Sequence, residues 1–115
     1  MKVIIAGSRN FNDYDLLFNK CDNALSNQTD IEIVSGTAYG ADTLGEKYAT
    51  ERGYKIKLFP ADWNSHGKMA GYFRNREMAK YADALICFWD AKSKGSKMMI
   101  DLENEHKLKV KVYLF

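Results

Sequence analysis

Short β-branched runs alternate with segments of helical periodicity along the whole chain. Five apolar runs are typical of strands, at residues 2–6, 31–34, 55–59, 84–89 and 110–114. Four segments between them carry apolar residues at helical spacing, over residues 13–25, 41–52, 69–81 and 96–107. Strands joined by helices of this length pair in parallel through right-handed crossovers. We therefore predict a Rossmann-like three-layer α/β sandwich with a five-stranded, mostly parallel sheet of order 3-2-1-4-5.

The length and charge of the chain limit the classes of protein to which it can belong. With 115 residues, 46% of them hydrophobic, the chain has enough apolar surface for one domain over residues 1–115 without disulfides or metals. The formal net charge is only +2, which argues against the global positive field of a dedicated nucleic-acid binder. A local basic patch is still compatible with this small net charge.

Targeting and metal signals are weak. The first apolar run stops at Gly7, too early for a signal peptide or a membrane span, so we expect a cytoplasmic protein with no membrane partner. Cys21 and Cys87 lie in apolar patterns without CxxC spacing and are expected to be reduced core thiols. His66 and His106 are isolated, so we predict no metal site, and we expect no cofactor.

The predicted topology places a ligand site at one edge of the sheet. In doubly wound sheets ligands bind beyond the carboxyl ends of the strands, where the strand order reverses. Here the reversal falls between the first and fourth strands, so the loops at 7–10 and 89–96 face each other, flanked by 35–42. The candidate ligand-binding residues are Gly7, Ser8, Arg9, Ser35, Gly36, Gly40, Asp42, Arg74, Asn75, Trp89, Asp90, Ser93, Gly95 and Ser96.

The three loops share features that suit an anion. Arg9 can hold a phosphate through two parallel hydrogen bonds. The stretches 35–42 and 93–96 run through small residues directly into helices, which exposes free backbone N–H groups at the positive ends of those helices. Neither stretch is a GxGxxG or Walker motif. Two carboxylates have alternative roles: Asp42 and Asp90 either contact ligand or cap the turns that follow them.

The third predicted helix supplies a further arginine. If this helix begins near Met69, Arg74 shares a face with Met78 whereas Arg76 points elsewhere, so one arginine reaches the crevice. Its aromatic residues, Tyr72, Phe73 and Tyr81, are expected in the core. The tryptophans have two interpretations, stacking on a base or packing in the core. The sequence favours core packing for Trp89 and does not distinguish between the two interpretations for Trp63.

Five ordered blocks resemble a known family. They are Gly-Ser-Arg-x-Phe at 7–11, Ser-Gly-x-Ala-x-Gly-Ala-Asp at 35–42, Pro-Ala-Asp-Trp at 60–63, Ala-Gly-x-x-Arg-Asn-x-x-Met at 70–78, and Ala-Asp-x-Leu-Ile-x-Phe-Trp-Asp at 82–90. Together they resemble the YspA-like branch of the SLOG superfamily, related to the Lonely Guy phosphoribohydrolases and DNA-processing protein A. The resemblance implies a Rossmann-like domain with a pocket for nucleotides or their derivatives, and a role in sensing such ligands.

The same resemblance argues against phosphoribohydrolase chemistry. Aligning Gly95-Ser96 with the Gly-Thr of the Lonely Guy motif puts Met99 where that motif has its catalytic glutamate. An N-glycosidic bond breaks through a cationic transition state that a nearby carboxylate stabilises. Asp101 lies about 200° further round a helix and is a poor substitute.

Three functions follow from these observations. The first is binding or sensing of a phosphorylated nucleoside or an NAD derivative, with no reaction catalysed. The second is hydrolysis of a nucleotide or N-glycoside, with Asp42, Asp62 or Asp90 as the carboxylate. The third is single-stranded DNA binding, because blocks 35–42 and 74–75 are similar to those of the DNA-processing protein. The small molecule is the favoured partner, nucleic acid the less favoured one, and a homo-oligomer is compatible with the sequence.

Overall fold

One parallel sheet forms the centre of the molecule, and its strand order is the predicted 3-2-1-4-5. The structure is a computed structural model that describes residues 1–115. The strands are β1 (Lys2–Gly7), β2 (Glu32–Ser35), β3 (Lys55–Leu58), β4 (Ala84–Trp89) and β5 (Lys109–Leu114). The order reverses between β1 and β4, whose registers pair Gly7 with Phe88. The two strands therefore end together at the edge where ligands bind in such folds.

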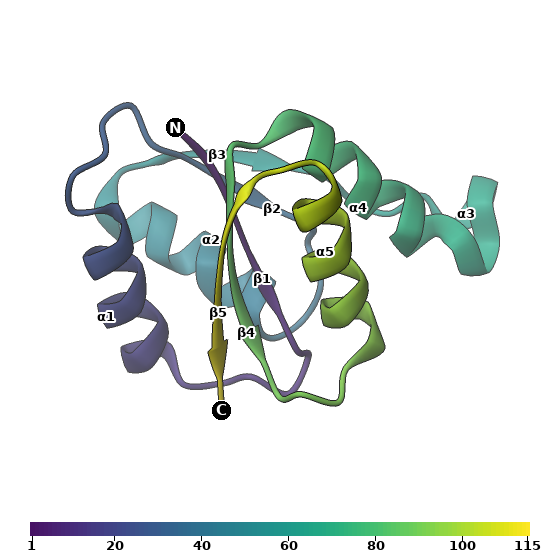
Figure 1. Ribbon diagram of the computed structural model, residues 1–115, viewed down its shortest axis with the longest axis horizontal. Helices are drawn as coiled ribbons and strands as arrows, with labels where there is room; N and C mark the ends of the chain where they lie inside the picture. Colours follow the sequence, from purple (N-terminus) through teal and green to yellow (C-terminus); the bar gives the residue numbers. More distant parts are fainter.

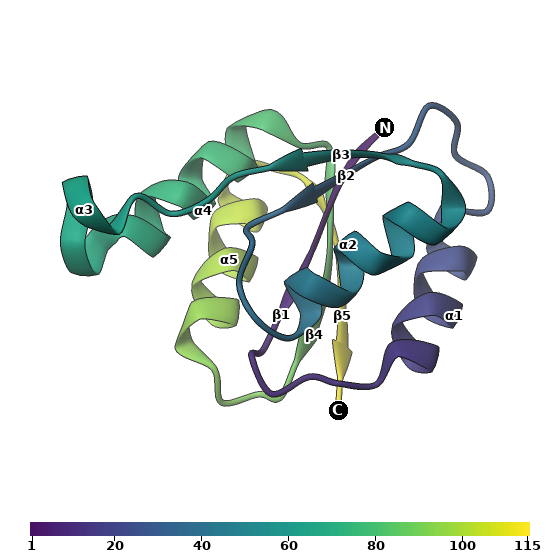
Figure 2. The ribbon, with the colours of Figure 1, turned by 180° about the vertical axis from the view of Figure 1, so that it is seen from behind.

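Helices cover both faces of the sheet, which confirms the predicted three-layer sandwich (Figures 1 and 2). The four long helices are α1 (Tyr14–Leu25), α2 (Ala41–Arg52), α4 (Ala70–Tyr81) and α5 (Lys94–Glu105). α1 and α2 lie on one face, and α4 and α5 on the other (Figure 1). No helix is both long enough and apolar enough to cross a membrane.

The stretch between β3 and α4, predicted as a loop, holds a short helix. It contains α3 (Trp63–His66) and a 3₁₀ turn, η1 (Gly67–Met69), which extend from the end of α4 away from the sheet (Figure 1). Asp62 caps α3, because its Oδ1 accepts a hydrogen bond of 3.1 Å from the Ser65 amide. One capped turn has no apolar periodicity, so the sequence pattern did not reveal it.

The last helix is shifted two residues toward the N-terminus from its predicted range of 96–107. Ser93 is its N-cap, with Oγ accepting from the Ser96 amide at 3.4 Å, so the helix begins at Lys94. At the other end Lys107 takes a φ of 62°, which is incompatible with helix continuation. The shift places Gly95 and Ser96 inside the first turn.

Two apolar layers flank the sheet because successive residues of β1 point to opposite faces. Val3 and Ile5 lie in a cluster of 13 buried residues under α1 and α2, here named the α1/α2 core. Ile4 and Ala6 lie in a cluster of 8 under α4 and α5, here named the α4/α5 core. The two cysteines, Cys21 and Cys87, are buried and unbonded, one in each core, and burial raises the pKa of both thiols to about 12.

The prediction that Phe73 lies in the core is wrong. Its side chain is 38% exposed, and its ring lies 4.7 Å from the ring of His66. α4 extends past the sheet toward α3, so its first turns have a neighbour other than the core (Figure 2). Tyr72 and Tyr81 are half-buried, and only the latter packs against the α4/α5 core.

Candidate functional site

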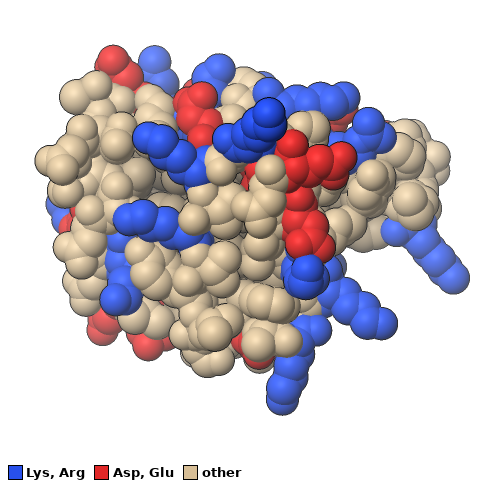
Figure 3. All heavy atoms as spheres, in the orientation of Figure 1, with Lys and Arg blue, Asp and Glu red and all other residues tan.

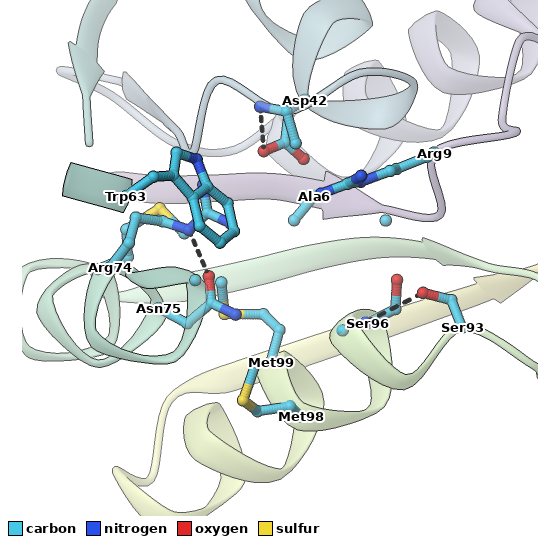
Figure 4. A pocket seen from close by; sticks show the side chains of 15 residues that line it. Ala6, Arg9, Asp42, Trp63, Arg74, Asn75, Ser93, Ser96, Met98 and Met99 are labelled. Atoms are coloured by element: carbon cyan, nitrogen blue, oxygen red, sulfur yellow. Dashed lines mark hydrogen bonds between the residues drawn. The ribbon is translucent and has the colours of Figure 1, made fainter. Parts of the chain in front are cut away.

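Two adjoining hollows lie at the carboxyl edge of the sheet. The first, here named the inner cavity, has a volume of about 160 Å³. Its lining consists of Ala6, Gly7, Arg9, Ala38, Asp42, Trp63, Gly71, Arg74, Asn75, Met78, Ser93, Gly95, Ser96, Met98 and Met99 (Figure 4). The second, here named the outer groove, has a volume of about 470 Å³ and is lined by Arg9, Gly36, Thr37, Ala38, Tyr39, Pro60, Ala61, Trp63 and Arg74. The hollows share four residues and form one continuous depression.

The structure brings most of the predicted site residues together. Those that line the inner cavity are Gly7, Arg9, Asp42, Arg74, Asn75, Ser93, Gly95 and Ser96. Gly36 lines the outer groove. The remaining five, Ser8, Ser35, Gly40, Trp89 and Asp90, line neither hollow. The three loops therefore converge on one depression, although some of their residues serve the loops themselves.

Ser8 and Ser35 are buried, and their hydroxyls make hydrogen bonds within the protein. The Ser8 Oγ accepts a hydrogen bond of 3.2 Å from the Asp90 amide, which links the loop after β1 to the loop after β4. The Ser35 Oγ donates to Glu46 Oε2 at 2.7 Å and accepts from the Thr37 amide at 3.1 Å. Both serines fix the shape of the site from behind.

Gly40 lets the start of α2 meet the loop after β1. Its φ is +80°, a conformation that favours glycine. A Cβ at this position would lie 2.5 Å from the Ser8 carbonyl oxygen and 2.7 Å from that of Arg9. Gly40 therefore places the Arg9 backbone against α2, and its role is close packing within the protein.

Trp89 and Asp90 shape the turn that leads into α5. The Asp90 Oδ1 accepts hydrogen bonds from the amides of Lys92 at 2.9 Å and Ser93 at 2.8 Å. These bonds lower the pKa of Asp90, because they favour its charged form. The Trp89 Nε1 donates to the Ser93 carbonyl at 3.0 Å. Of the two roles considered for Asp90, capping is the one present in the structure.

Two arginines reach the depression from different elements. Arg74, on α4, donates from Nη1 to the Gly36 carbonyl and from Nε to Asn75 Oδ1 at 2.7 Å. Burial lowers the pKa of Arg74, and the charge of Asp42 opposes that effect.

Arg9 extends from the loop after β1 toward the cavity (Figure 4). Its side chain is exposed and has no hydrogen bond or ion pair with the chain. Arg76 points away, and its guanidinium lies 5.7 Å from the Tyr72 ring centre.

Asp42 is the one carboxylate of the inner cavity. It is 5% exposed, and its Oδ2 accepts a hydrogen bond of 3.2 Å from the Ala38 amide. Burial raises the pKa of Asp42 to about 6, although that hydrogen bond and the charge of Arg74 both act to lower it. A Cβ on Gly36 would lie 2.8 Å from Arg74 Nη1 and 2.9 Å from Asp42 Oδ2, so the absence of a side chain there admits both groups.

The first turn of α5 presents unused polar groups to the cavity. The Ser96 Oγ is buried and has no nitrogen or oxygen as a hydrogen-bond partner; the polar group beside it is the weakly hydrogen-bonding Cys87 thiol. The amides of Lys94 and Gly95 make no hydrogen bond within the chain, as expected for the first residues of a helix. These donors face two guanidinium groups and one carboxylate, so an anionic ligand suits the cavity.

Comparison with known proteins establishes the family. Residues 1–66 match the family model described as YspA, cpYpsA-related SLOG family. The chain belongs to this SLOG family. It is also 32% identical, over 103 residues, to the Gene 61 protein of Mycobacterium phage D29, which covers 84% of this chain and 82% of that protein.

A solved structure confirms the fold of this SLOG protein. The X-ray structure of DNA processing protein A from Streptococcus pneumoniae matches 96% of the chain with a TM-score of 0.77 and 21% sequence identity. The match covers 49% of that protein, so the SLOG chain spans about half its length. At this identity the likeness establishes the Rossmann-like architecture alone.

Sequence reasoning missed several residues that line the SLOG depression. Ala38, Met98 and Gly71 carry no polar signal that would mark them as site residues. Thr37 and Tyr39 lie inside the predicted anion-binding loop at 35–42, and the sequence favours neither interpretation of Trp63. Asp62, a carboxylate candidate, caps α3 and lines neither hollow. No group of three His, Cys, Asp or Glu side chains is placed to hold a metal.

Proposed function

We propose that this SLOG protein is a binding module, over residues 1–115, for a phosphorylated nucleoside or an NAD derivative. The ligand's phosphate occupies the inner cavity. The observation that carries the proposal is the Ser96 hydroxyl, which is buried with no nitrogen or oxygen partner in a cavity that Arg9 also enters without a partner. Buried polar groups are nearly always hydrogen-bonded, so an unpartnered hydroxyl in a cavity points to a ligand.

The chemistry of the cavity fits a phosphate. Arginine binds phosphate through two parallel hydrogen bonds, and Arg9 has its full set of donors free. The free amide of Gly95, at the positive end of α5, adds a donor and favourable charge. The Asp42 carboxylate is the acceptor available for a ribose hydroxyl next to that phosphate.

A thermal-shift titration tests this proposal. Nucleoside monophosphates and NAD should raise the melting temperature, since a ligand that binds only the folded state stabilises it by mass action. Arg9→Ala should remove this increase and leave the melting temperature without ligand unchanged, because Arg9 has no partner in the chain. Arg76→Ala is the matched control and should retain the increase, since Arg76 lies outside the depression.

Two outcomes contradict the proposal. If Arg9→Ala keeps the full increase, the phosphate binds elsewhere. If Arg9→Ala unfolds the protein, the arginine is structural and the assignment of the site fails.

Hydrolysis is a second candidate because of Asp42. Asp42 is the one carboxylate that lines the inner cavity, and burial raises its pKa to about 6. A carboxyl with this pKa suits a proton donor or acceptor near neutral pH. Met99 lines the same cavity at the position where the related phosphoribohydrolases have glutamate, which counts against their chemistry. Chromatography of nucleotides incubated with the protein would show released base only if Asp42 acts in catalysis, and Asp42→Asn would abolish that release.

Single-stranded nucleic acid is the third candidate. The solved structure that shares the fold is named DNA processing protein A, which relates that protein to DNA. On the face in Figure 3, however, Lys and Arg side chains are scattered among acidic ones and form no continuous band. Lys97, in the first turn of α5 beside the depression, pairs with Asp101 at 2.8 Å. A nucleotide-sized ligand therefore has the stronger support.

A further inference from the structure

We infer that the outer groove is a nucleobase subsite in which Trp63 and Tyr39 stack on the base of a ligand whose phosphate lies in the inner cavity. This inference rests on the proposed function and adds to it the orientation of the ligand. It assigns the base to the rim of the depression and the phosphate to its floor.

The two aromatic side chains of the outer groove, Trp63 and Tyr39, are exposed and have few partners within the protein. Trp63 is 54% exposed and Tyr39 is 79% exposed. Neither ring packs on another aromatic ring or under a Lys or Arg side chain, whereas Tyr14, Phe18 and Tyr48 of the α1/α2 side do one or both. The Trp63 Nε1 and the Tyr39 hydroxyl make no hydrogen bond with the chain. Both side chains keep their faces and donors available.

Their position relates these rings to the phosphate site. Trp63 lines both hollows, together with Arg9 and Arg74 (Figure 4). A Cβ built on Gly71 would lie 3.8 Å from both Arg74 Nη2 and Trp63 Cη2, so the indole and the guanidinium border the same small residue. A ligand phosphate held by the arginines therefore directs its other end toward Trp63.

The sizes of the hollows decide which end of the ligand lies where. The inner cavity, at about 160 Å³, is smaller than the roughly 300–1,000 Å³ of ordinary small-molecule sites, whereas the outer groove, at about 470 Å³, falls within that range. Arg9, Arg74 and Trp63 border both hollows, whereas the Gly95 amide and the Ser96 hydroxyl lie at the small one alone and the Tyr39 ring lies at the large one alone. A phosphate inside and a base outside match both the volume and the chemistry.

Thr37 adds a backbone observation at the same place. It lines the outer groove with a φ of +63°, a strained conformation for a β-branched residue, and the Ser35 hydroxyl holds its amide. Strained backbone of this kind clusters at ligand sites, where the surrounding structure maintains it. The strained turn presents Tyr39 at the rim of the groove.

Calorimetric titration with two ligands tests the subsite. Adenosine 5'-monophosphate and ribose 5-phosphate differ only by the base, so the ratio of their affinities measures the base subsite. The wild-type protein should bind the nucleotide on the order of tenfold more tightly, as expected for one base stacked on an aromatic side chain. Trp63→Ala should bind the two ligands equally, with the affinity for ribose 5-phosphate unchanged.

Three variants guard against an effect on folding. Trp63→Phe should restore part of the preference for the nucleotide, since it keeps an aromatic face. Tyr39→Ala should reduce the preference without touching α3, because Tyr39 belongs to the loop before α2. Phe73→Ala is the matched control: it removes an exposed aromatic ring on α4 outside both hollows and should keep the wild-type ratio.

Each other outcome has one meaning. Equal binding of the two ligands by the wild-type protein would overturn the base subsite and leave the phosphate site intact. Binding of neither ligand would overturn the proposed function as well. Much tighter, Trp63-dependent binding of a six-residue thymidine oligonucleotide, weakened steeply by salt, would replace the single nucleotide with single-stranded nucleic acid.

Discussion

The two faces of the sheet are filled in different ways. The α1/α2 core includes the rings of Phe11, Tyr48 and Phe88, and those of Phe11 and Phe88 stack with their centres 4.8 Å apart. The α4/α5 core is smaller and relies on alanine, methionine and short aliphatic side chains, with Met78 and Met99 also forming walls of the inner cavity. One face is packed throughout, and the other leaves a cavity beside its core.

The buried polar groups show the same difference. On the α2 side, Ser35 and Asp42 both have hydrogen-bond partners. On α5, the Ser96 hydroxyl and both carboxylate oxygens of Glu103 are buried without a nitrogen or oxygen partner. Since an unpartnered buried group costs about 1–3 kcal/mol, the α4/α5 face gives up stability that the α1/α2 face supplies. Three pairs of substitutions test this difference between the two faces.

The largest effect is expected from the α1/α2 core. Tyr48 is fully buried, and its hydroxyl donates to Asp22 Oδ1 at 2.7 Å. Tyr48→Ala should lower the free energy of unfolding by roughly 3–5 kcal/mol, measured by urea denaturation. Met99→Ala on the other face should cost about 2 kcal/mol, the low end for such changes, because Met99 borders a cavity and has fewer packing contacts to lose. Equal costs for the two variants would remove the distinction between the faces.

The next effect concerns Glu103 and pH. Burial raises the pKa of Glu103 from 4.5 to about 7. Below pH 4.5 the carboxyl is protonated in both states; as pH rises toward 7 the unfolded chain releases its proton first, so stability falls. The difference between the two pKa values corresponds to a loss of roughly 3 kcal/mol by pH 8.

Urea denaturation at pH 4.5 and pH 8 measures this loss. Glu103→Gln should reduce the pH dependence by roughly half, leaving the fall with the same sign that Asp42 contributes between its ordinary pKa of 3.8 and about 6. Glu105→Gln, an exposed position on the same helix, should keep the wild-type slope. A Glu103→Gln variant with an unchanged slope would show that this carboxyl finds solvent or a partner in solution.

The smallest effect separates binding from stability. Gly36→Ala introduces a methyl group 2.8 Å from Arg74 Nη1 and 2.9 Å from Asp42 Oδ2, so the guanidinium must move. Nucleotide affinity should fall about tenfold, an effect of about 1.4 kcal/mol on binding, while the free energy of unfolding changes by less than about 1 kcal/mol.

Gly71→Ala is the matched change for that measurement. Its methyl group would lie 3.8 Å from Arg74 Nη2 and Trp63 Cη2, an ordinary contact, so affinity should stay within about twofold of wild type. Unaltered binding by Gly36→Ala would mean that the position of Arg74 does not matter to the ligand.

Much of the fold could be predicted from local patterns. Continuous or alternating apolar runs marked all five strands, and helical spacing marked the four long helices. The convergence of loops 7–10, 35–42 and 89–96 followed from the strand order, because parallel strands end at a common edge. The one-turn helix α3 escaped prediction, since a single capped turn repeats no pattern.

The sequence predicted the individual residues of the candidate site less well than it predicted the fold. Asp42 and Asp90 both follow strands in glycine- and serine-rich loops, and both satisfy backbone amides, yet only Asp42 lines the cavity. The sequence alone determined the strand and helix periods and the chemistry available at each loop. The tertiary structure decided which polar atoms already have partners and which, like the Ser96 hydroxyl, face a cavity without a nitrogen or oxygen partner. A hydrogen-bond partner is distant along the chain, so local sequence cannot reveal whether it is present.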